Sequence, residues 1–299
     1  MVTLGELSCF VADPDECDSI KLHQAAVNGN IVILQELLKD EENVKNIDMR
    51  SPPFGTTPLR LAATSGEVEC AKLLLDNGAD VNATDFKAQT PLFLAIKNNQ
   101  IECADLLLQY GANPNGDDRN STTPLYTASQ LGLAIAVELL IKYGALTEIN
   151  HRLVCGLPGS PLHIAIVYKH LSCFRTLLLG GAEPNMENLR PMLPQAIISR
   201  LSFPHTMTRH QCSKEFVYLF RIFGGNLWQR DGNNQLATEL ENNETNAYIA
   251  ELMSRPLSLT NHCRIAIRRF LTRQRLIFIP NLPLPSSLLA FLQYKELKI

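Results

Sequence analysis

Three side chains that commonly bind zinc, His205, His210 and Cys212, lie close together in the sequence. A structural zinc site needs a fourth ligand, and the chain has no C-x2-C pair, so residues 201–212 are interpreted as an irregular loop. No phosphate-binding glycine loop, H-E-x-x-H sequence or nucleophile elbow occurs in the chain. The sequence therefore predicts no catalytic residue, no metal site and no cofactor, and the protein is expected not to be an enzyme.

Near the C-terminus, apolar residues recur at i, i+4, i+8, i+11 and i+12, the spacing of one helix face. The residues on this face are Leu259, Cys263, Ile267, Phe270 and Leu271. Arg264, Arg268 and Arg273 fall largely off it. Such a helix is expected to bind in the groove of a partner.

A proline-rich segment follows, with the sequence Ile279-Pro280-Asn281-Leu282-Pro283-Leu284-Pro285, and it leads into a short apolar helix with Leu288, Phe291 and Leu292. Proline fixes φ and lowers the entropy lost on binding. We interpret this segment as a second docking surface.

Two other interpretations of the C-terminal region stay open. Leu259 and Cys263 could pack inward, as part of a helix that only caps the domain before it. Residues 252–295 also contain no Asp or Glu, and a basic stripe can bind nucleic acid. The stripe consists of Arg255, Arg264, Arg268, Arg269, Arg273 and Arg275. Because it lacks interleaved aromatic residues, a solvated helix face or a surface for an acidic protein partner is expected instead.

The elements before this region are predicted from a repeat. Thr57-Pro58-Leu59, Thr90-Pro91-Leu92 and Thr123-Pro124-Leu125 are 33 residues apart, and Gly78-Ala79 recurs at the same interval. The threonine can cap a first helix, the proline occupies its first turn, and the glycine ends a second helix in the left-handed conformation. The polar residues that follow are expected to form a hairpin loop.

The other copies of the repeat are less regular. A fourth full copy begins at Ser160-Pro161-Leu162, after an insertion at residues 151–158, and a degenerate first copy starts near Ile20. Helices are expected at residues 191–201, 214–223, 235–241 and 245–253, which gives about seven repeats. The predicted domains are an acidic mobile leader at 1–18, the repeat array at 19–254 and a C-terminal domain at 255–299.

Composition is consistent with a soluble globular protein, because 45% of the 299 residues are hydrophobic, 19% are charged and the net charge is −3. No apolar run is long enough to span a membrane, and residues 1–10 lack the features of a secretory signal. Cys70, Cys103 and Cys173 occupy equivalent repeat positions, which favours small buried hydrophobic residues in a reducing compartment. The expected location is the cytoplasm, with the nucleus as an alternative.

These patterns resemble a known family. Ser258-Leu259-x3-Cys263-x3-Ile267 is similar to the elongin-binding half of a SOCS box, and Leu282-Pro283-Leu284-Pro285-x2-Leu288-x2-Phe291-Leu292 is similar to its cullin-5-binding half. Together with the T-P-L repeats, the chain resembles the ankyrin-repeat and SOCS-box family. The resemblance implies an all-α ankyrin-repeat solenoid with a C-terminal three-helix SOCS box.

The same resemblance implies the substrate receptor of a cullin-5 ubiquitin ligase. Its partners would be elongin C with elongin B, cullin-5 with its RING protein, and an unidentified target, without nucleic acid or membrane. It places the elongin contact on the apolar helix face listed above, and the cullin contact on Ile279, Leu282, Pro283, Leu284, Pro285 and Leu288. The alternative is an ankyrin scaffold protein without a ligase role.

In an ankyrin array, equivalent positions of successive repeats line up on one concave surface. The positions predicted to bind the target are Phe86, Lys87, Gln89 and Lys97 in one repeat, and Arg119, Asn120, Thr122 and Gln130 in the next. Phe86 is the most informative, because a large aromatic residue at a hairpin tip resembles a binding anchor. The alternative is that Phe86 folds back over its own hairpin.

Overall fold

A computed structural model describes residues 17–148, 160–185, 202–240, 243–276 and 278–295. These residues form helices and loops, and their extended pairing is limited to two isolated antiparallel bridges, Ser51 with Thr56 and Arg230 with Leu236. The predicted all-α class is confirmed for this part of the chain. None of the described helices combines the length and apolarity that a membrane crossing would need.

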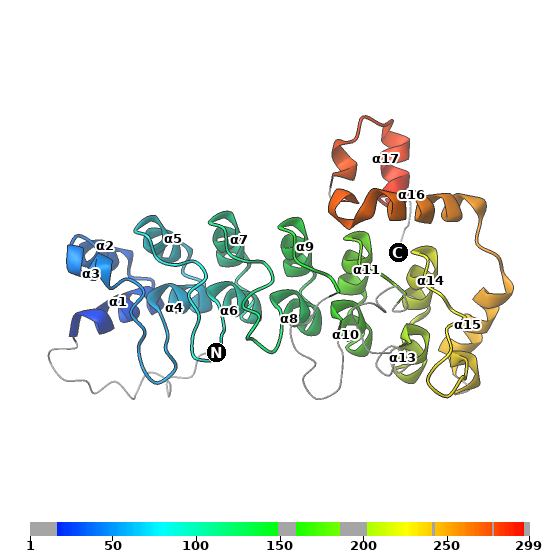
Figure 1. Cartoon of the computed structure of the whole chain (residues 1–299), viewed down its shortest axis with the longest axis horizontal. Helices are drawn as coiled ribbons and strands as arrows, with labels where there is room; N and C mark the ends of the chain where they lie inside the picture. Colours follow the sequence, from blue (N-terminus) through cyan, green and yellow to red (C-terminus); the bar gives the residue numbers. More distant parts are fainter. Residues whose placement is uncertain (1–16, 149–159, 186–201, 241–242, 277, 296–299) are drawn as a thin grey trace. The chain divides into compact units, whose positions relative to one another are not determined.

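Residues 1–120 form one compact unit and residues 121–299 a second. The helices of the first unit are α1 Cys17–Val27, α2 Ile31–Leu37, α3 Glu41–Lys45, α4 Pro58–Ser65, α5 Val68–Asp76, α6 Pro91–Lys97 and α7 Ile101–Gln109. α1, α4 and α6 pack in sequence as an inner layer, and α2, α5 and α7 form an outer layer (Figure 1). The short helix α3 was not expected from the sequence.

The helices of the second unit are α8 Pro124–Leu131, α9 Ala134–Lys142, α10 Pro161–Val167, α11 Leu171–Leu179, α13 Phe203–Arg209, α14 Lys214–Ile222, the 3-10 turn η4 Ala237–Glu239, α15 Glu244–Ser254, α16 Leu259–Leu276, the 3-10 turn η5 Ile279–Asn281 and α17 Ser286–Leu292. The inner helices α8, α10 and α13 pack in sequence, as do the outer helices α9, α11 and α14. The described residues thus hold three helix pairs in the first unit, and in the second unit three helix pairs and a pair made of the turn η4 and helix α15, in agreement with about seven repeats.

The predicted helix caps are present. The hydroxyl groups of Thr57, Thr90, Thr123 and Ser160 accept hydrogen bonds from the backbone N–H three residues later, at 3.1–3.3 Å. Gly78 has a φ of 91°, and a Cβ placed on it would meet no atom within 4 Å, so the left-handed backbone alone favours glycine. Asn99 adopts a φ of 58° at a position where the repeat usually has glycine. Asparagine therefore keeps the expected loop geometry.

The interpretation of residues 201–212 as an irregular loop is wrong, because residues 203–209 form α13. Phe203 and Met207 are fully buried, and α13 packs on α10 as the first helix of its repeat. In Ser202-Phe203-Pro204 the proline comes one position later than in Ser160-Pro161-Leu162, which the first turn still tolerates, and the Ser202 hydroxyl pairs with His205 and does not cap the helix.

The other expected helices near the end of the array agree with the structure only in part. α14 and α15 match the expected helices at 214–223 and 245–253 to within a residue or so. The helix expected at 235–241 is a single 3-10 turn, η4, followed by residues outside the described part. The helix expected at 191–201 and most of the 1–18 leader also lie outside the described residues.

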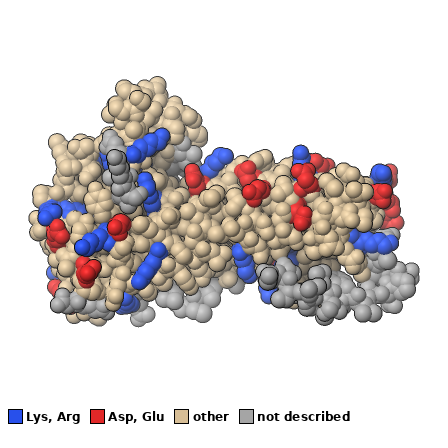
Figure 2. All heavy atoms as spheres, turned by 180° about the vertical axis from the view of Figure 1, so that it is seen from behind, with Lys and Arg blue, Asp and Glu red and all other residues tan. Residues whose placement is uncertain are grey.

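Acidic side chains outnumber basic ones on the outer helices of the first unit, where Lys72 is the one basic residue of α5 and α7. The outer helices α5 and α7 expose Glu69, Asp76 and Glu102, and Figure 2 shows acidic side chains gathered along the edge where these helices lie. The only charged residue of the inner helix α4 is Arg60, and that of α6 is Lys97. The inner side therefore carries a positive charge excess, which matters for the surface described below.

Candidate partner-binding surfaces

The helix α16 exposes its apolar face. Leu259 is 79% exposed and Phe270 82%, Cys263 and Ile267 are also exposed, and Leu271 is half-buried. These are the five residues predicted to contact elongin. In this chain Leu259 and Cys263 do not pack inward as the core of a capping helix. A strip of exposed apolar side chains on one helix is a feature that a binding partner would cover.

The opposite face of α16 buries charge. Arg264 is 3% exposed and Arg268 8%, and Ile265 packs beside them. The guanidinium of Arg264 lies over the rings of Phe291 and Tyr294, at 4.0 and 4.3 Å from their centroids. The expectation that these arginines form a solvated or partner-facing basic face is wrong for Arg264 and Arg268. Cation–π contact with aromatic residues makes their burial tolerable.

Arg268 joins three segments that lie far apart in the sequence. Its guanidinium donates hydrogen bonds to the carbonyl of Leu292 in α17 at 3.0 Å and to those of Leu178 and Leu179, at the end of α11, at 3.3 and 2.7 Å. The carbonyls at a helix C-terminus lack partners within the helix and favour cations. Burial lowers the pKa of Arg268 from its usual value. In Figure 1, α16 accordingly lies along α11 and α14.

Tyr294 completes this junction, and the sequence did not reveal it. Its ring stacks on Phe223 with centroids 4.0 Å apart, and its hydroxyl donates to the carbonyl of Ile222 at 3.1 Å. Burial raises the pKa of Tyr294. The i, i+4 spacing of Arg264 and Arg268 was the one available signal, since it places two long side chains on a common face.

The proline-rich segment presents a second set of exposed residues. Pro283, Leu284, Pro285 and Leu288 are exposed and Leu282 is half-buried. Ile279, which was grouped with them, is 1% exposed and belongs to the core of the C-terminal domain. The cullin contact predicted for this set stays a prediction, and the surface available for it in the free chain excludes Ile279.

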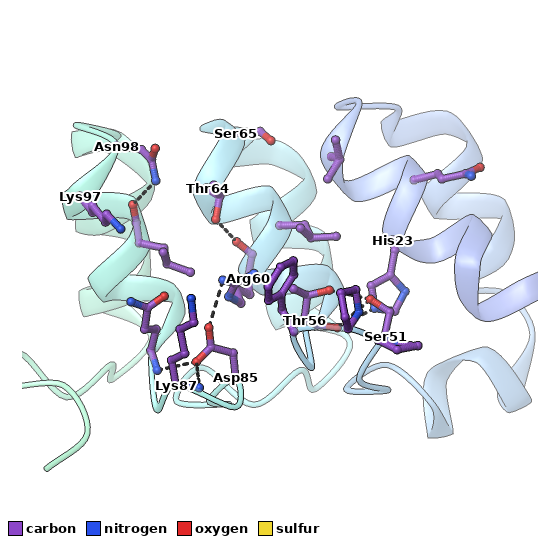
Figure 3. A pocket seen from close by; sticks show the side chains of 18 of the residues that line it. His23, Ser51, Thr56, Arg60, Thr64, Ser65, Asp85, Lys87, Lys97 and Asn98 are labelled. Carbon is purple, nitrogen blue, oxygen red and sulfur yellow. Dashed lines mark hydrogen bonds and ion pairs between the residues drawn. The ribbon is translucent and has the colours of Figure 1, made fainter. Parts of the chain in front are cut away.

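A cleft of about 510 Å³ opens on the inner side of the first unit (Figure 3). Asp85 organises one wall: its carboxylate pairs with Arg60 at 3.0 Å and accepts hydrogen bonds from the backbone N–H groups of Lys87 and Gln89, both at 2.8 Å. The Asp85 side chain is 1% exposed. Three of the residues predicted to bind a target, Lys87, Gln89 and Lys97, line this cleft.

Phe86 lies at the hairpin tip and is 68% exposed. Its ring lies against Gly55 of the preceding hairpin, where an added Cβ would come within 2.8 Å of the ring, and its N–H donates to the Phe54 carbonyl at 3.1 Å. Phe86 therefore rests on the neighbouring hairpin and not on its own, with much of the ring open to solvent. The Lys87 ammonium stands 5.6 Å from the Phe54 ring centroid.

The remaining predicted target residues are less available. Arg119 is held by Asp117 through two hydrogen bonds of 3.0 and 2.8 Å, and this contact lowers the pKa of Asp117 to about 2. Asn120 is buried. Gln130 belongs to the second unit and donates to the Tyr168 hydroxyl at 3.4 Å. The structure thus groups Phe86, Lys87, Gln89 and Lys97 on one surface, with Arg119 at its edge.

Two of the three candidate metal ligands, His205 and Cys212, are engaged in other contacts. His205 hydrogen-bonds to the Ser202 hydroxyl at 2.7 Å and to the Gln235 carbonyl at 3.0 Å, and the Cys212 thiol contacts the Ile166 carbonyl. Within the described ranges, no group of three or more His, Cys, Asp or Glu side chains could hold a metal ion. These residues instead connect neighbouring repeats.

Comparison with known proteins assigns both parts of the chain. Models of ankyrin repeats match residues 22–118, 83–153 and 115–188, and a model of the SOCS box matches residues 255–293. Ankyrin repeat and SOCS box protein 1 of Mus musculus is 44% identical to this chain, with 94% of this chain and 90% of the relative covered. The chain belongs to the ankyrin repeat and SOCS box family.

A second relative, ankyrin repeat and SOCS box protein 12 of Homo sapiens, is 44% identical over 95% of this chain and 93% of its own length. The human ASB11 ankyrin repeat domain has the same fold, with a TM-score of 0.58 at 24% identity over 79% of this chain and 99% of that domain. The predicted family and the ankyrin-repeat fold with a C-terminal SOCS box are confirmed. Family membership supports, in general terms, a non-catalytic adaptor that serves as substrate receptor of a ubiquitin ligase.

Proposed function

We propose that this protein is the substrate receptor of a ligase built from elongin B, elongin C, cullin-5 and a RING protein, and that it acts in the cytoplasm. The SOCS box docks to elongin C and cullin-5, and the ankyrin repeats hold a target protein. No bond is made or broken by this chain. Its contribution is to raise the effective concentration of target lysines near a ubiquitin thioester that is formed elsewhere in the complex.

One observation carries the proposal: α16 exposes the apolar residues Leu259, Ile267 and Phe270 while it buries Arg264 and Arg268. A helix that packs on a domain usually buries its apolar side and exposes its charged side. Burying two arginines costs desolvation, which their ring and carbonyl contacts offset. The helix is thereby held with its apolar side outward, as the docking of a partner groove requires.

The elongin contact is tested with Leu259→Ala in the full chain. The side chain is 79% exposed, so a partner that covers it removes most of its surface from water. Loss of three carbons at about 0.8 kcal/mol each, scaled by that exposure, gives about 2 kcal/mol, or about thirtyfold in affinity. Titration of purified elongin B/C into the chain by calorimetry measures this change.

Ile135→Ala provides the matched control, because Ile135 is also an exposed aliphatic residue on a helix, α9, outside both SOCS-box surfaces. It should bind elongin B/C as the unmodified chain does. Equal affinity of Leu259→Ala and the unmodified chain would contradict the proposed contact. Absence of any elongin binding would favour the scaffold interpretation.

The cullin contact is separable from the elongin contact. Substituting Leu284 and Leu288 with Ala alters two exposed residues of the proline-rich segment and leaves α16 intact. Recruitment of cullin-5 to a preformed complex with elongin B/C should weaken while elongin affinity is retained. Parallel loss of both would show that the segment supports the fold of the SOCS box and is not a separate docking surface.

A further inference from the structure

The cleft of the first unit has cations that no carboxylate of the described residues neutralises. Of the residues that line it, Asp85 is the one acidic side chain, and its carboxylate is occupied by Arg60 and two backbone N–H groups. Lys87 and Lys97 also line the cleft, and neither forms an ion pair with a carboxylate of the described residues. Figure 3 shows Lys87 on the hairpin that carries Asp85, and Lys97 at the end of α6 that lies away from this hairpin.

A second hollow adjoins the cleft through Lys87, which lines both. It is bordered by Arg50, Phe86 and Arg119. Arg50 is exposed, and it too has no ion-pair partner in the described part of the chain. The two hollows therefore form one continuous surface on which Arg50, Lys87 and Lys97 present unpaired positive charge.

Apolar groups lie between these cations. Phe54 lines the cleft and Phe86 the adjoining hollow, and both rings are partly exposed. The opposite, outer layer of the same unit exposes Glu69, Asp76 and Glu102. The outer helices α5 and α7 thus expose three acidic side chains and the single lysine Lys72, whereas the inner surface combines cations with aromatic rings.

We infer that this inner surface binds an acidic segment of the target protein, in which carboxylates flank one apolar side chain. The carboxylates pair with Lys87, Lys97 and Arg50, and the apolar side chain packs between Phe54 and Phe86. The inference rests on the proposed receptor function and names the chemistry of its target. A protein segment fits better than a nucleic acid, because the Phe86 ring already packs on Gly55 with one face and three cations are few for a phosphate backbone.

Charge complementarity of this kind favours fast association and suppresses partners of the wrong charge, more than it increases affinity. The acidic side chains of the outer helices would repel an acidic target segment and so favour its approach to the inner surface. Because salt screens these charges, the preference of the inner surface for acidic segments should weaken as salt is added.

The test selects short peptides from a random displayed library with the full chain as bait. The selected peptides are expected to be rich in Asp and Glu around an apolar residue. A synthetic copy should bind about tenfold more weakly when its acids are replaced by Asn and Gln, and about tenfold more weakly to the Lys87→Glu/Lys97→Glu chain. The matched control is Lys45→Glu/Lys72→Glu, which reverses the charge of two exposed lysines in α3 and α5. This variant should bind the peptide with the affinity of the unmodified chain.

A selection without acidic enrichment, or one that yields no peptide, would overturn the inference. So would equal affinity of the inner-surface variant and the control variant, or tighter binding of an oligo-dT probe than of the acidic peptide. Elongin B/C affinity is measured on the same variants. If the chain binds elongin B/C but shows no preference for acidic peptides, this inference alone is rejected. If the unmodified chain does not bind elongin B/C, the receptor function is rejected.

Discussion

Arg268 should be the residue that fixes the SOCS box on the repeats. Arg268→Met keeps a long apolar side chain but removes the donors for the carbonyls of Leu179 and Leu292, which now accept hydrogen bonds of 2.7 and 3.0 Å. A buried carbonyl left without its donor costs about 1–3 kcal/mol, so the two together predict a loss of about 3 kcal/mol. Relief of guanidinium desolvation reduces this value, and loss of the ring contacts with Phe223 and Tyr294 adds to it.

The assay is hydrogen exchange of the backbone amides in α16, which reports the local opening free energy of that helix. Arg269→Met is the matched control, because Arg269 is the next arginine on the same helix, is exposed, and reaches the Gly224 carbonyl only at 3.5 Å. Arg268→Lys should recover part of the loss, since one ammonium cannot reproduce the planar guanidinium contacts. Equal protection of α16 in Arg268→Met, Arg269→Met and the unmodified chain would refute this account of the junction.

Two further predictions concern the repeats. Burial lowers the pKa of His163 to about 4 from an unfolded value near 6.5, so its contribution to stability is complete above pH 6.5 and is lost as the pH falls toward 4, by up to about 3 kcal/mol. Urea unfolding of His163→Gln should show a weaker pH dependence over this interval, and an unchanged dependence, or the same change in His262→Gln, would contradict the assignment. Asp85→Asn keeps an oxygen for the hairpin N–H groups but removes the carboxylate charge that pairs with the largely buried Arg60 at 3.0 Å, which should cost about 3 kcal/mol in the same measurement. Asp117→Asn removes a comparable but exposed pair and should change stability little, and equal effects of the two substitutions would argue against a structural role for Asp85.

The repeat helices were predictable because local residues specify them. Thr57 and Pro58 define the start of a helix through a cap and a fixed φ, and their spacing to Gly78 fixes the length of the pair. At α13 the proline is displaced by one position, to Pro204, and Ser202 gives no side-chain cap, so a search for the fixed motif fails although the helix forms. The sequence therefore predicts the regular T-P-L repeats better than the degenerate repeats at the end of the array.

The burial of Arg264 and Arg268 was not predictable in the same way. An arginine on a helix is usually solvated, and the groups that reverse this preference, such as Phe223 and Tyr294, come from segments far away in the sequence. The apolar strip of α16 was predictable from its spacing, but the reason that it faces outward lies in those distant contacts. Similarly, the cations of the inner surface are visible in the sequence, whereas the pairing of Arg60 with Asp85 that leaves Lys87 and Lys97 available requires the fold.

Alkylation of Cys263 tests most directly the claim that elongin C covers the exposed strip of α16. Cys263 is exposed on that strip, whereas Cys70, Cys103, Cys173 and Cys212 are buried, and burial raises the pKa of the last three thiols to about 11. Peptide mass spectrometry after a short exposure to N-ethylmaleimide follows each cysteine separately. The account predicts rapid modification of Cys263 in the free chain and at least about tenfold slower modification with saturating elongin B/C. An unchanged rate at Cys263 in the presence of elongin B/C would contradict it.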